Sequence, residues 1–444
     1  MSGRPLGWFG IVRLGLVQAA IGSVVVLTTS TLNRVMAVEY ALPVSIPAAL
    51  VAWHYAVQLS RPRWGHGSDV GGARTPWIVM GMGVLALGAL IATNAAVAMT
   101  DAPVLAGIAS VIAYAMIGGG VAAAGTSLLA LLATAVAPER RPAAAAITWI
   151  MMIVGIVLTA GISGQLLDPF SPQRLIFVAS GIAVIAFVLT LIAVRGIERG
   201  VARSVPSETV PADFRTALAS VWNEPVARQF TVFVFVSMLA YSAQDLILEP
   251  YAGLVFGYTL GQSTSLAGVQ HGGVLVGMVL VGIAGSLLRG DRAVWMTRMT
   301  VFGCVASALA LAALALAGQT GPAWPLKSTV FALGFANGVF AVSAIAMMMS
   351  LAGAGGEARS GLKMGVWGAA QAMAFGLGGF AGAAGLDLMR RLVDATPDAF
   401  ATVFILEGIL FVFAAALMLR LGARKVVATA DGSAPLNFNS GGSA

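Results

Sequence analysis

Twelve apolar stretches, separated by short breaks with charged residues, Pro or Gly, run through this sequence. They lie at residues 14–37, 44–60, 76–99, 105–136, 142–166, 174–195, 229–250, 264–288, 293–318, 325–352, 362–388 and 398–421. A helix needs about 20 apolar residues to cross a bilayer. Only 10% of the residues are charged, against about a quarter in soluble domains, so most of the surface must face lipid. The sequence predicts an all-α, polytopic membrane protein of about 12 transmembrane helices.

One stretch leaves the number of spans open. Residues 105–136 are long enough to contain a break, which would fall at the triplet Gly118, Gly119 and Gly120. Glycine lowers helix stability by about 1 kcal/mol relative to alanine, which is why three in a row suggest an interruption.

The positive charges predict the orientation. With a cytoplasmic N-terminus, 20 of the 25 Lys and Arg residues lie on the cytoplasmic side. The positive-inside rule therefore places both termini in the cytoplasm, and an even number of spans agrees. These loop arginines account for the net charge of +7, so we expect no nucleic-acid partner.

A polar segment divides the chain into two similar halves. Residues 196–228 follow the sixth span and contain three prolines and a short amphipathic helix expected near 213–222. We interpret them as a cytoplasmic linker between six-helix halves at 1–195 and 229–422. Residues 423–444 are rich in Gly, Ser and Ala, which predicts a disordered cytoplasmic tail.

A short segment with Gly, Asp and Arg follows the second span of each half. It carries Gly65, Asp69 and Arg74 in the first half, and Asp291 and Arg292 in the second. Glycine permits a tight turn, and aspartate can cap a helix N-terminus or pair with an arginine. This loop resembles the signature of the major facilitator superfamily. That resemblance implies two pseudo-symmetric six-helix halves, a common transporter architecture.

Polar residues recur at corresponding ends of the first and seventh spans. They are Asn33, Arg34 and Glu39 in one, and Gln244, Asp245 and Glu249 in the other. Ionisable groups at this depth are costly unless they are paired or solvated. In the facilitator fold these two helices face each other, which suggests a gate in which Arg34 pairs with Asp245 or Glu249. The alternative is interfacial anchoring just beyond the hydrocarbon.

Two histidines occupy corresponding spans, His54 in the second and His271 in the eighth. Neutral imidazole can ligate a metal or relay protons, and Gly268 and Gly272 leave room for a flat ring beside His271. The alternative is a histidine bonded to a neighbouring helix, with glycines that allow close packing. The residues alone favour this alternative. We find no Walker motif, metalloprotease helix or cysteine cluster, so neither an enzyme nor a metal site of its own is expected.

Several strings resemble one branch of the superfamily. The most specific is Thr-Leu-Asn-Arg-Val-Met at residues 31–36; others lie at 13–18, 61–69, 74–77, 137–142 and 244–251. They resemble the PucC/LhaA family, the bacteriochlorophyll delivery branch, over essentially the whole chain up to the tail. The chain starts only a few residues before its first span. In this it is similar to the shorter members encoded among pigment-synthesis genes.

The resemblance implies a function. Such a protein would carry bacteriochlorophyll or a late precursor, as cargo, and assist light-harvesting complex assembly in the bacterial inner membrane. Its partners would be lipid, pigment, antenna apoproteins and pigment-synthesis enzymes, and the pigment magnesium would be ligated by His54 or His271. Two alternatives remain. One is a proton-coupled transporter of a small solute, which the scarcity of acids in the spans disfavours. The other is a pigment-free scaffold for antenna polypeptides.

Overall fold

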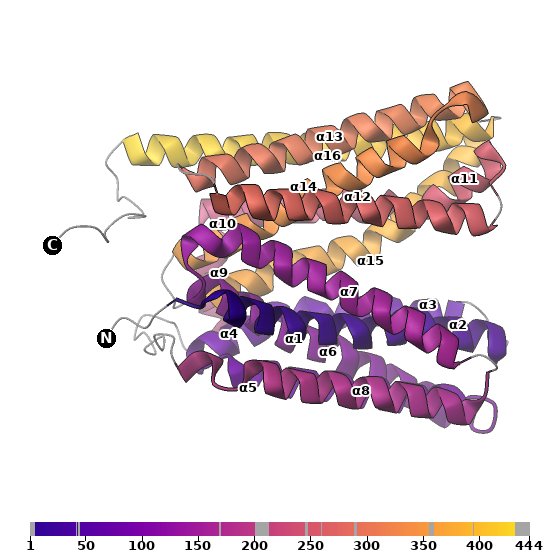
Figure 1. Cartoon of the computed structure of the whole chain (residues 1–444), viewed down its shortest axis with the longest axis horizontal. Helices are drawn as coiled ribbons and strands as arrows, with labels where there is room; N and C mark the ends of the chain where they lie inside the picture. The colour runs from indigo at the N-terminus through magenta and orange to yellow at the C-terminus, as the bar shows by residue number, and fades with distance from the viewer. Residues whose placement is uncertain are drawn as a thin grey trace. The chain divides into compact units, whose positions relative to one another are not determined.

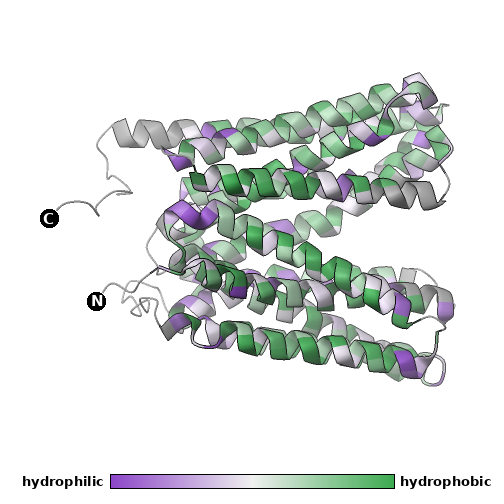
Figure 2. Cartoon of the chain, in the orientation of Figure 1, coloured by the Kyte–Doolittle hydropathy of each residue, from purple (hydrophilic) through white to green (hydrophobic). Residues whose placement is uncertain are grey.

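The computed structural model describes residues 5–40, 42, 45–167, 170–199, 213–244, 247–258, 260–287, 291–354, 359–393 and 395–430. Within these ranges the secondary structure is entirely helical (Figure 1). Eleven of the described helices are long and apolar enough to cross a membrane. They are green along most of their length in Figure 2, where purple residues gather near the helix ends. The predicted multi-pass, all-α fold is confirmed.

The helices group into two compact units. Unit 1 comprises Met1–Ala219 and Gly355–Ala372, and unit 2 comprises Ser220–Ala354 and Met373–Ala444. Helix α15 (Ser360–Leu392) contributes its first residues to unit 1 and the remainder to unit 2.

Unit 1 is built around helices that pack side by side. Helix α5 lies along α6, and α1 lies against α7 and α8. Buried aliphatic side chains such as Leu14, Leu85 and Ile117 fill the space between them. Its main helices are α1 (Trp8–Val26), α3 (Ser45–Val57), α4 (Arg61–Val70), α5 (Thr75–Val97), α6 (Pro103–Ala135), α7 (Arg141–Leu166) and α8 (Pro172–Val194).

The second expected span runs without a break into the segment predicted as a loop. Helix α3 has only 13 residues, but it continues through a short 3₁₀ turn, Gln58–Ser60, into α4. The prediction of a loop at Gly65 and Asp69 is therefore wrong, because both residues are helical. A Cβ at Gly65 would overlap the carbonyl oxygen of Gly361 on α15. The glycine thus serves close helix packing, which offsets its low helix propensity.

Helix α6 is continuous from Pro103 to Ala135, so the expected interruption at Gly118–120 is absent. A Cβ at Gly118 would lie 2.5 Å from the carbonyl oxygen of His54, and one at Gly120 would lie 2.6 Å from that of Gly81. These glycines let α3 and α5 approach α6 closely, as small residues do in membrane helix packing.

Unit 2 has an aromatic core. Helix α13 lies alongside α14 and α16 (Figure 1). Phe340 on α14 contacts Phe233 on α10 and Phe411 on α16, with ring centroids 6.4 and 5.8 Å apart. Besides the part of α15 from Met373 on, the helices of this unit are α10 (Pro225–Ala243), α11 (Leu248–Phe256), α12 (Leu260–Leu287), α13 (Arg292–Thr320), α14 (Leu326–Ala354) and α16 (Thr396–Ala430).

Two segments outside the spans were also predicted. The amphipathic linker helix is confirmed as α9 (Phe214–Asn223). An oxygen of Asp213 accepts a hydrogen bond from the Thr216 amide at 2.9 Å, and this bond lowers the pKa of Asp213. Helix α16 extends to Ala430, into the segment predicted as a tail, because adding residues to an existing helix is easier than starting one. Residues 200–212 and 431–444 lie outside the described ranges.

Candidate functional site

The family-specific string lies on a distorted stretch of the first helix. Two π-helical turns, Leu27–Thr31 and Val35–Glu39, flank the short helix α2 (Leu32–Arg34). Such turns are rare and often occur at functional sites, because they disrupt the regular ladder of backbone hydrogen bonds. The hydroxyl of Tyr114 on α6 donates to the carbonyl oxygen of Thr28 at 2.8 Å, and both side chains are buried. A side chain from α6 therefore supports the distorted segment.

We expect Tyr114→Phe to lower the free energy of unfolding by about 1–3 kcal/mol, because it leaves the buried Thr28 carbonyl without this donor. Thermal unfolding in mild detergent measures the change. Tyr40→Phe is the matched control, since the buried Tyr40 hydroxyl has no hydrogen-bond partner among the described residues. An equal loss in both variants would contradict the role assigned to Tyr114.

The polar residues predicted as a gate are only partly described. Asn33 is half-buried, Glu39 is exposed and Gln244 is fully buried. Asp245 and the side chains of Arg34 and Glu249 lie outside the described part of the chain. The ion pair of Arg34 with Asp245 or Glu249 therefore stays a prediction.

His54 is part of a hydrogen-bonded chain along its own helix. Its side chain is only 1% exposed, and its Nε2 lies 2.8 Å from Nε2 of Gln58. The Gln58 carbonyl accepts from Arg61, which leaves the Gln58 amide nitrogen to donate to Nε2 of His54. The Nε2 lone pair is then already used, but by a residue of the same continuous helix and not by the neighbouring helix that the alternative to ligation predicted.

His271 has a different environment. It is exposed on α12 between Gly268 and Gly272, where an added Cβ would have no atom within 4 Å. Glycines on the opposite side, Gly273 and Gly277, pack tightly against α14. The exposed side continues with apolar residues, and we call it the α12 face: Gly268, His271, Gly272, Val276, Val279, Leu280 and Ile283. This face places a histidine next to open space and a row of apolar side chains.

Asp69 joins α4 to the start of α15 within unit 1. Its carboxylate accepts from the backbone N–H groups of Gly361 and Leu362, each at 2.8 Å, and pairs with Arg74 at 3.1 Å. Burial raises the pKa of Asp69 to about 6, although Arg74 and both N–H groups act in the opposite direction. The carboxyl is therefore mostly ionised at neutral pH. Both chemical roles expected for this aspartate, the helix cap and the arginine pair, are present together.

Two further carboxylates cap helices at comparable positions. Glu198 accepts from the backbone N–H groups of Arg74 and Thr75, each at 2.9 Å, at the start of α5. In the second half, exposed Asp291 caps α13 by accepting from the amides of Ala293 and Val294 at 2.9 and 3.2 Å. Arg292 begins that helix and is half-buried. Asp291 thus caps its own helix, whereas Asp69 caps a distant one.

A family model described as PUCC protein matches residues 31–426. The chain belongs to the PUCC protein family. Relatives agree with this assignment. The chain is 54% identical over 412 residues to a Rhodobacter capsulatus protein named "Bacteriochlorophyll synthase 44.5 kDa chain", covering 92% of this chain and 94% of that one. It is 31% identical over 406 residues to the "Protein PucC" of Cereibacter sphaeroides, covering 87% and 84%.

Solved structures identify the fold of this PUCC-family protein. A bacterial homologue of the iron transporter ferroportin, in an outward-facing state, superposes with a TM-score of 0.76 at 14% identity, covering 94% of this chain and 100% of that one. The proton:xylose symporter XylE, a major facilitator superfamily protein, gives 0.67 at 14% identity, covering 93% and 94%. The predicted major facilitator fold is confirmed.

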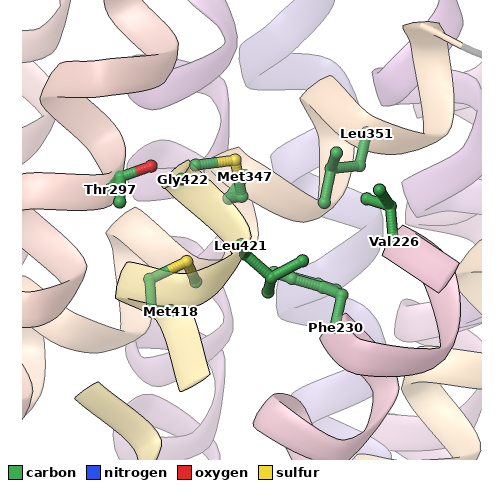
Figure 3. A pocket seen from close by; sticks show the side chains of 8 residues that line it. All are labelled: Val226, Phe230, Thr297, Met347, Leu351, Met418, Leu421 and Gly422. Atoms are coloured by element: carbon green, nitrogen blue, oxygen red, sulfur yellow. The ribbon is translucent and has the colours of Figure 1, made fainter. Parts of the chain in front are cut away.

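A small apolar hollow in unit 2 is distinct from these predicted sites. It has a cavity volume of about 10 Å³ and lies among α10, α13, α14 and α16 (Figure 3), lined by Val226, Phe230, Thr297, Met347, Leu351, Met418, Leu421 and Gly422. Ligand pockets usually enclose roughly 300–1,000 Å³. The hollow is therefore too small to hold a macrocycle.

Sequence reasoning missed the burial of three charged residues in this PUCC-family protein, Arg141, Lys363 and Glu407. Glu407 on α16 is 3% exposed, and Lys363 on α15 is 6% exposed. An acid in the middle of the apolar stretch 398–421 was the available signal for Glu407, because charged residues inside a span are often functional. Lys363 lies at the start of its span, where it resembles an ordinary interfacial residue. Glu198 was also overlooked, and nothing in its local sequence marks it as a cap for α5.

Proposed function

We propose that this protein carries bacteriochlorophyll, or a late precursor, and delivers it during assembly of light-harvesting complexes. Two relatives carry names that point to this context, one to bacteriochlorophyll synthesis and the other to PucC. We place the protein in the inner membrane of a photosynthetic bacterium with both termini cytoplasmic, as the excess of Lys and Arg on one side indicates.

The main support for the proposed pigment carrier is the α12 face. The magnesium of the pigment needs an axial ligand, and neutral imidazole at His271 can supply one. The space beside Gly268 and Gly272 leaves room for a flat ring, and the apolar residues further along α12 suit a hydrocarbon tail. A protein of this kind binds and releases its cargo without making or breaking covalent bonds, so we propose that it is not an enzyme. Antenna apoproteins and pigment-synthesis enzymes are the proposed partners.

The test is purification of the full chain in mild detergent from pigment-producing cells, followed by an absorption spectrum. A far-red band that co-purifies with the protein supports the carrier. Antenna polypeptides without pigment would favour the scaffold instead. If neither is present, the carrier proposal fails.

The alternative function, a proton-coupled transporter, would use Glu407 as its proton-binding residue. A carboxyl buried in the middle of a span can take up and release protons as its surroundings change. In this alternative, Glu407→Gln abolishes proton movement in proteoliposomes. In the carrier that we propose, Glu407→Gln leaves pigment retention unchanged.

A further inference from the structure

Arg141 is a buried arginine whose guanidinium has no hydrogen-bond partner. It begins helix α7, and its side chain is only 7% exposed. Among the described residues it takes part in no hydrogen bond or salt bridge, and its Nε is fully enclosed. The two terminal nitrogens are not enclosed, so the tip of the side chain reaches accessible space. Buried charges in proteins are normally paired or hydrogen-bonded, which sets this arginine apart.

Arg74 shows how the same group is accommodated elsewhere in unit 1. Its side chain is also buried, and its guanidinium donates to Asp69 at 3.1 Å, to Ser360 at 2.6 Å and to Thr134 at 3.2 Å. Arg141 has no comparable acceptors among the described residues. Its tip is therefore available to an acceptor that the chain itself does not provide. The planar guanidinium matches the oxygens of a phosphate or carboxylate, which it can bind through two parallel hydrogen bonds.

The chain around Arg141 carries further positive charge. Arg140 precedes it and is half-buried. The first turn of α7 contains no acidic residue, and the aligned peptide dipoles of a helix attract anions to its N-terminus. The exposed Glu139 opposes this attraction, because its carboxylate acts on Arg141 electrostatically. Two cations against one anion leave this turn of the chain positively charged.

Exposed aromatic side chains lie beside this charged turn. The guanidinium carbon of Arg140 is 5.4 Å from the ring centroid of Trp8, and its Nη1 donates to the carbonyl oxygen of Leu6 at 3.4 Å. Trp8 is 48% exposed and Phe9 is 76% exposed, both at the start of the first helix. Tryptophan at the end of a membrane helix lies at the level of the lipid headgroups, and basic clusters on the cytoplasmic side bind anionic headgroups. These neighbours favour a lipid as the source of the anion.

We propose that Arg141 binds the phosphate group of an anionic phospholipid at the cytoplasmic end of α7. Its terminal nitrogens donate to the phosphate oxygens, Arg140 adds electrostatic attraction, and Trp8 and Phe9 contact the acyl chains. All four residues belong to unit 1, and the site does not depend on the proposed pigment cargo. Lipid binding pairs a charge that folding leaves unpaired, so the lipid stabilises the protein.

The test follows the thermal midpoint of the full chain in mild detergent while dioleoylphosphatidylglycerol is added. The midpoint of the wild-type protein should rise. Arg141→Gln should weaken the affinity for this lipid by about tenfold or more, as expected for the loss of a hydrogen bond to a charged group. Arg174→Gln is the matched control, because Arg174 is an exposed arginine in the first turn of α8, and it should respond as the wild type does.

Two further variants test the charge at this site without removing it. Arg141→Lys keeps the charge but loses the planar pair of donors, so it should recover only part of the affinity. Glu139→Gln removes the opposing carboxylate and should tighten lipid binding by about two- to fivefold, the range for a surface charge pair. These variants decide the matter if Arg141→Gln does not fold.

Two other probes identify the source of the phosphate. Dioleoylphosphatidylcholine, whose headgroup has no net charge, should raise the midpoint less than phosphatidylglycerol does, and inorganic phosphate should act only at far higher concentration. A response to inorganic phosphate that Arg141→Gln removes, with no response to phosphatidylglycerol, would overturn the lipid assignment. Equal responses to phosphatidylglycerol in the wild type and Arg141→Gln would overturn the site itself. Unchanged affinity in both Glu139→Gln and Arg141→Lys would do the same.

Discussion

Replacing Asp69 with alanine is expected to lower the free energy of unfolding by about 3–5 kcal/mol, the range for breaking a buried ion pair. The substitution leaves the Arg74 side chain, which is 5% exposed, without its carboxylate. It also removes the acceptor of the Gly361 and Leu362 N–H groups. Thermal and denaturant unfolding in detergent measure the loss, and proteolysis near the start of α15 should become faster.

Asp291→Ala is the matched control for Asp69→Ala. Asp291 occupies the corresponding segment of the second half, but it is exposed and caps only its own helix. Losing an exposed N-cap costs about 1 kcal/mol. Equal losses in the two variants would show that the contact with α15 contributes no stability beyond an ordinary cap.

Pigment binding should depend on the α12 face. His271→Leu is expected to abolish co-purifying pigment while the protein still inserts and folds, because leucine cannot ligate magnesium. Gly272→Leu should have a similar effect by filling the open space beside the ring. The measurement is the ratio of far-red to protein absorbance after size-exclusion chromatography. Retained pigment with an unchanged spectrum in His271→Leu would exclude this histidine as the ligand.

Two controls separate pigment binding from folding. Gly164→Leu places the same bulk on α7, at an exposed glycine that also has no atom within 4 Å of an added Cβ, and it should leave pigment retention unchanged. His54→Leu should lower the thermal midpoint, because the buried Gln58 amide nitrogen loses its acceptor, and should spare the pigment. Loss of pigment in His54→Leu with full retention in His271→Leu would reverse the assignment of the two histidines.

Glycines illustrate the limit of reading this sequence alone. The same residue type marks an expected break at Gly118, a loop at Gly65 and open space at Gly272. In the structure, Gly118 and Gly65 are helical packing contacts, and only Gly272 faces open space. Which role a glycine takes depends on the distance to a neighbouring helix, and that distance is set by the packing of residues far away in the chain.

The histidines differ for a similar reason. Both lie in corresponding spans, so the sequence favours neither His54 nor His271 as the ligand of the pigment magnesium. The structure shows that Gln58, one turn away, engages His54, whereas His271 is exposed on a glycine-lined face. The Gln at i+4 from His54 was visible in the sequence, but the exposure of each side chain was not.

The apolar stretches by themselves determined the membrane fold. Backbone N–H and C=O groups in lipid must be hydrogen-bonded within the protein, and an apolar stretch of about 20 residues achieves this on its own as a helix. The string at residues 31–36 also indicated the family from the sequence alone, through its resemblance to the PucC/LhaA family. Only the tertiary structure decided that the segment from residue 61 to 70 is a helix whose Asp69 caps α15 and that Glu407 is buried. Each of these depends on which helices meet, and contacts between helices arise from long-range packing that local sequence does not specify.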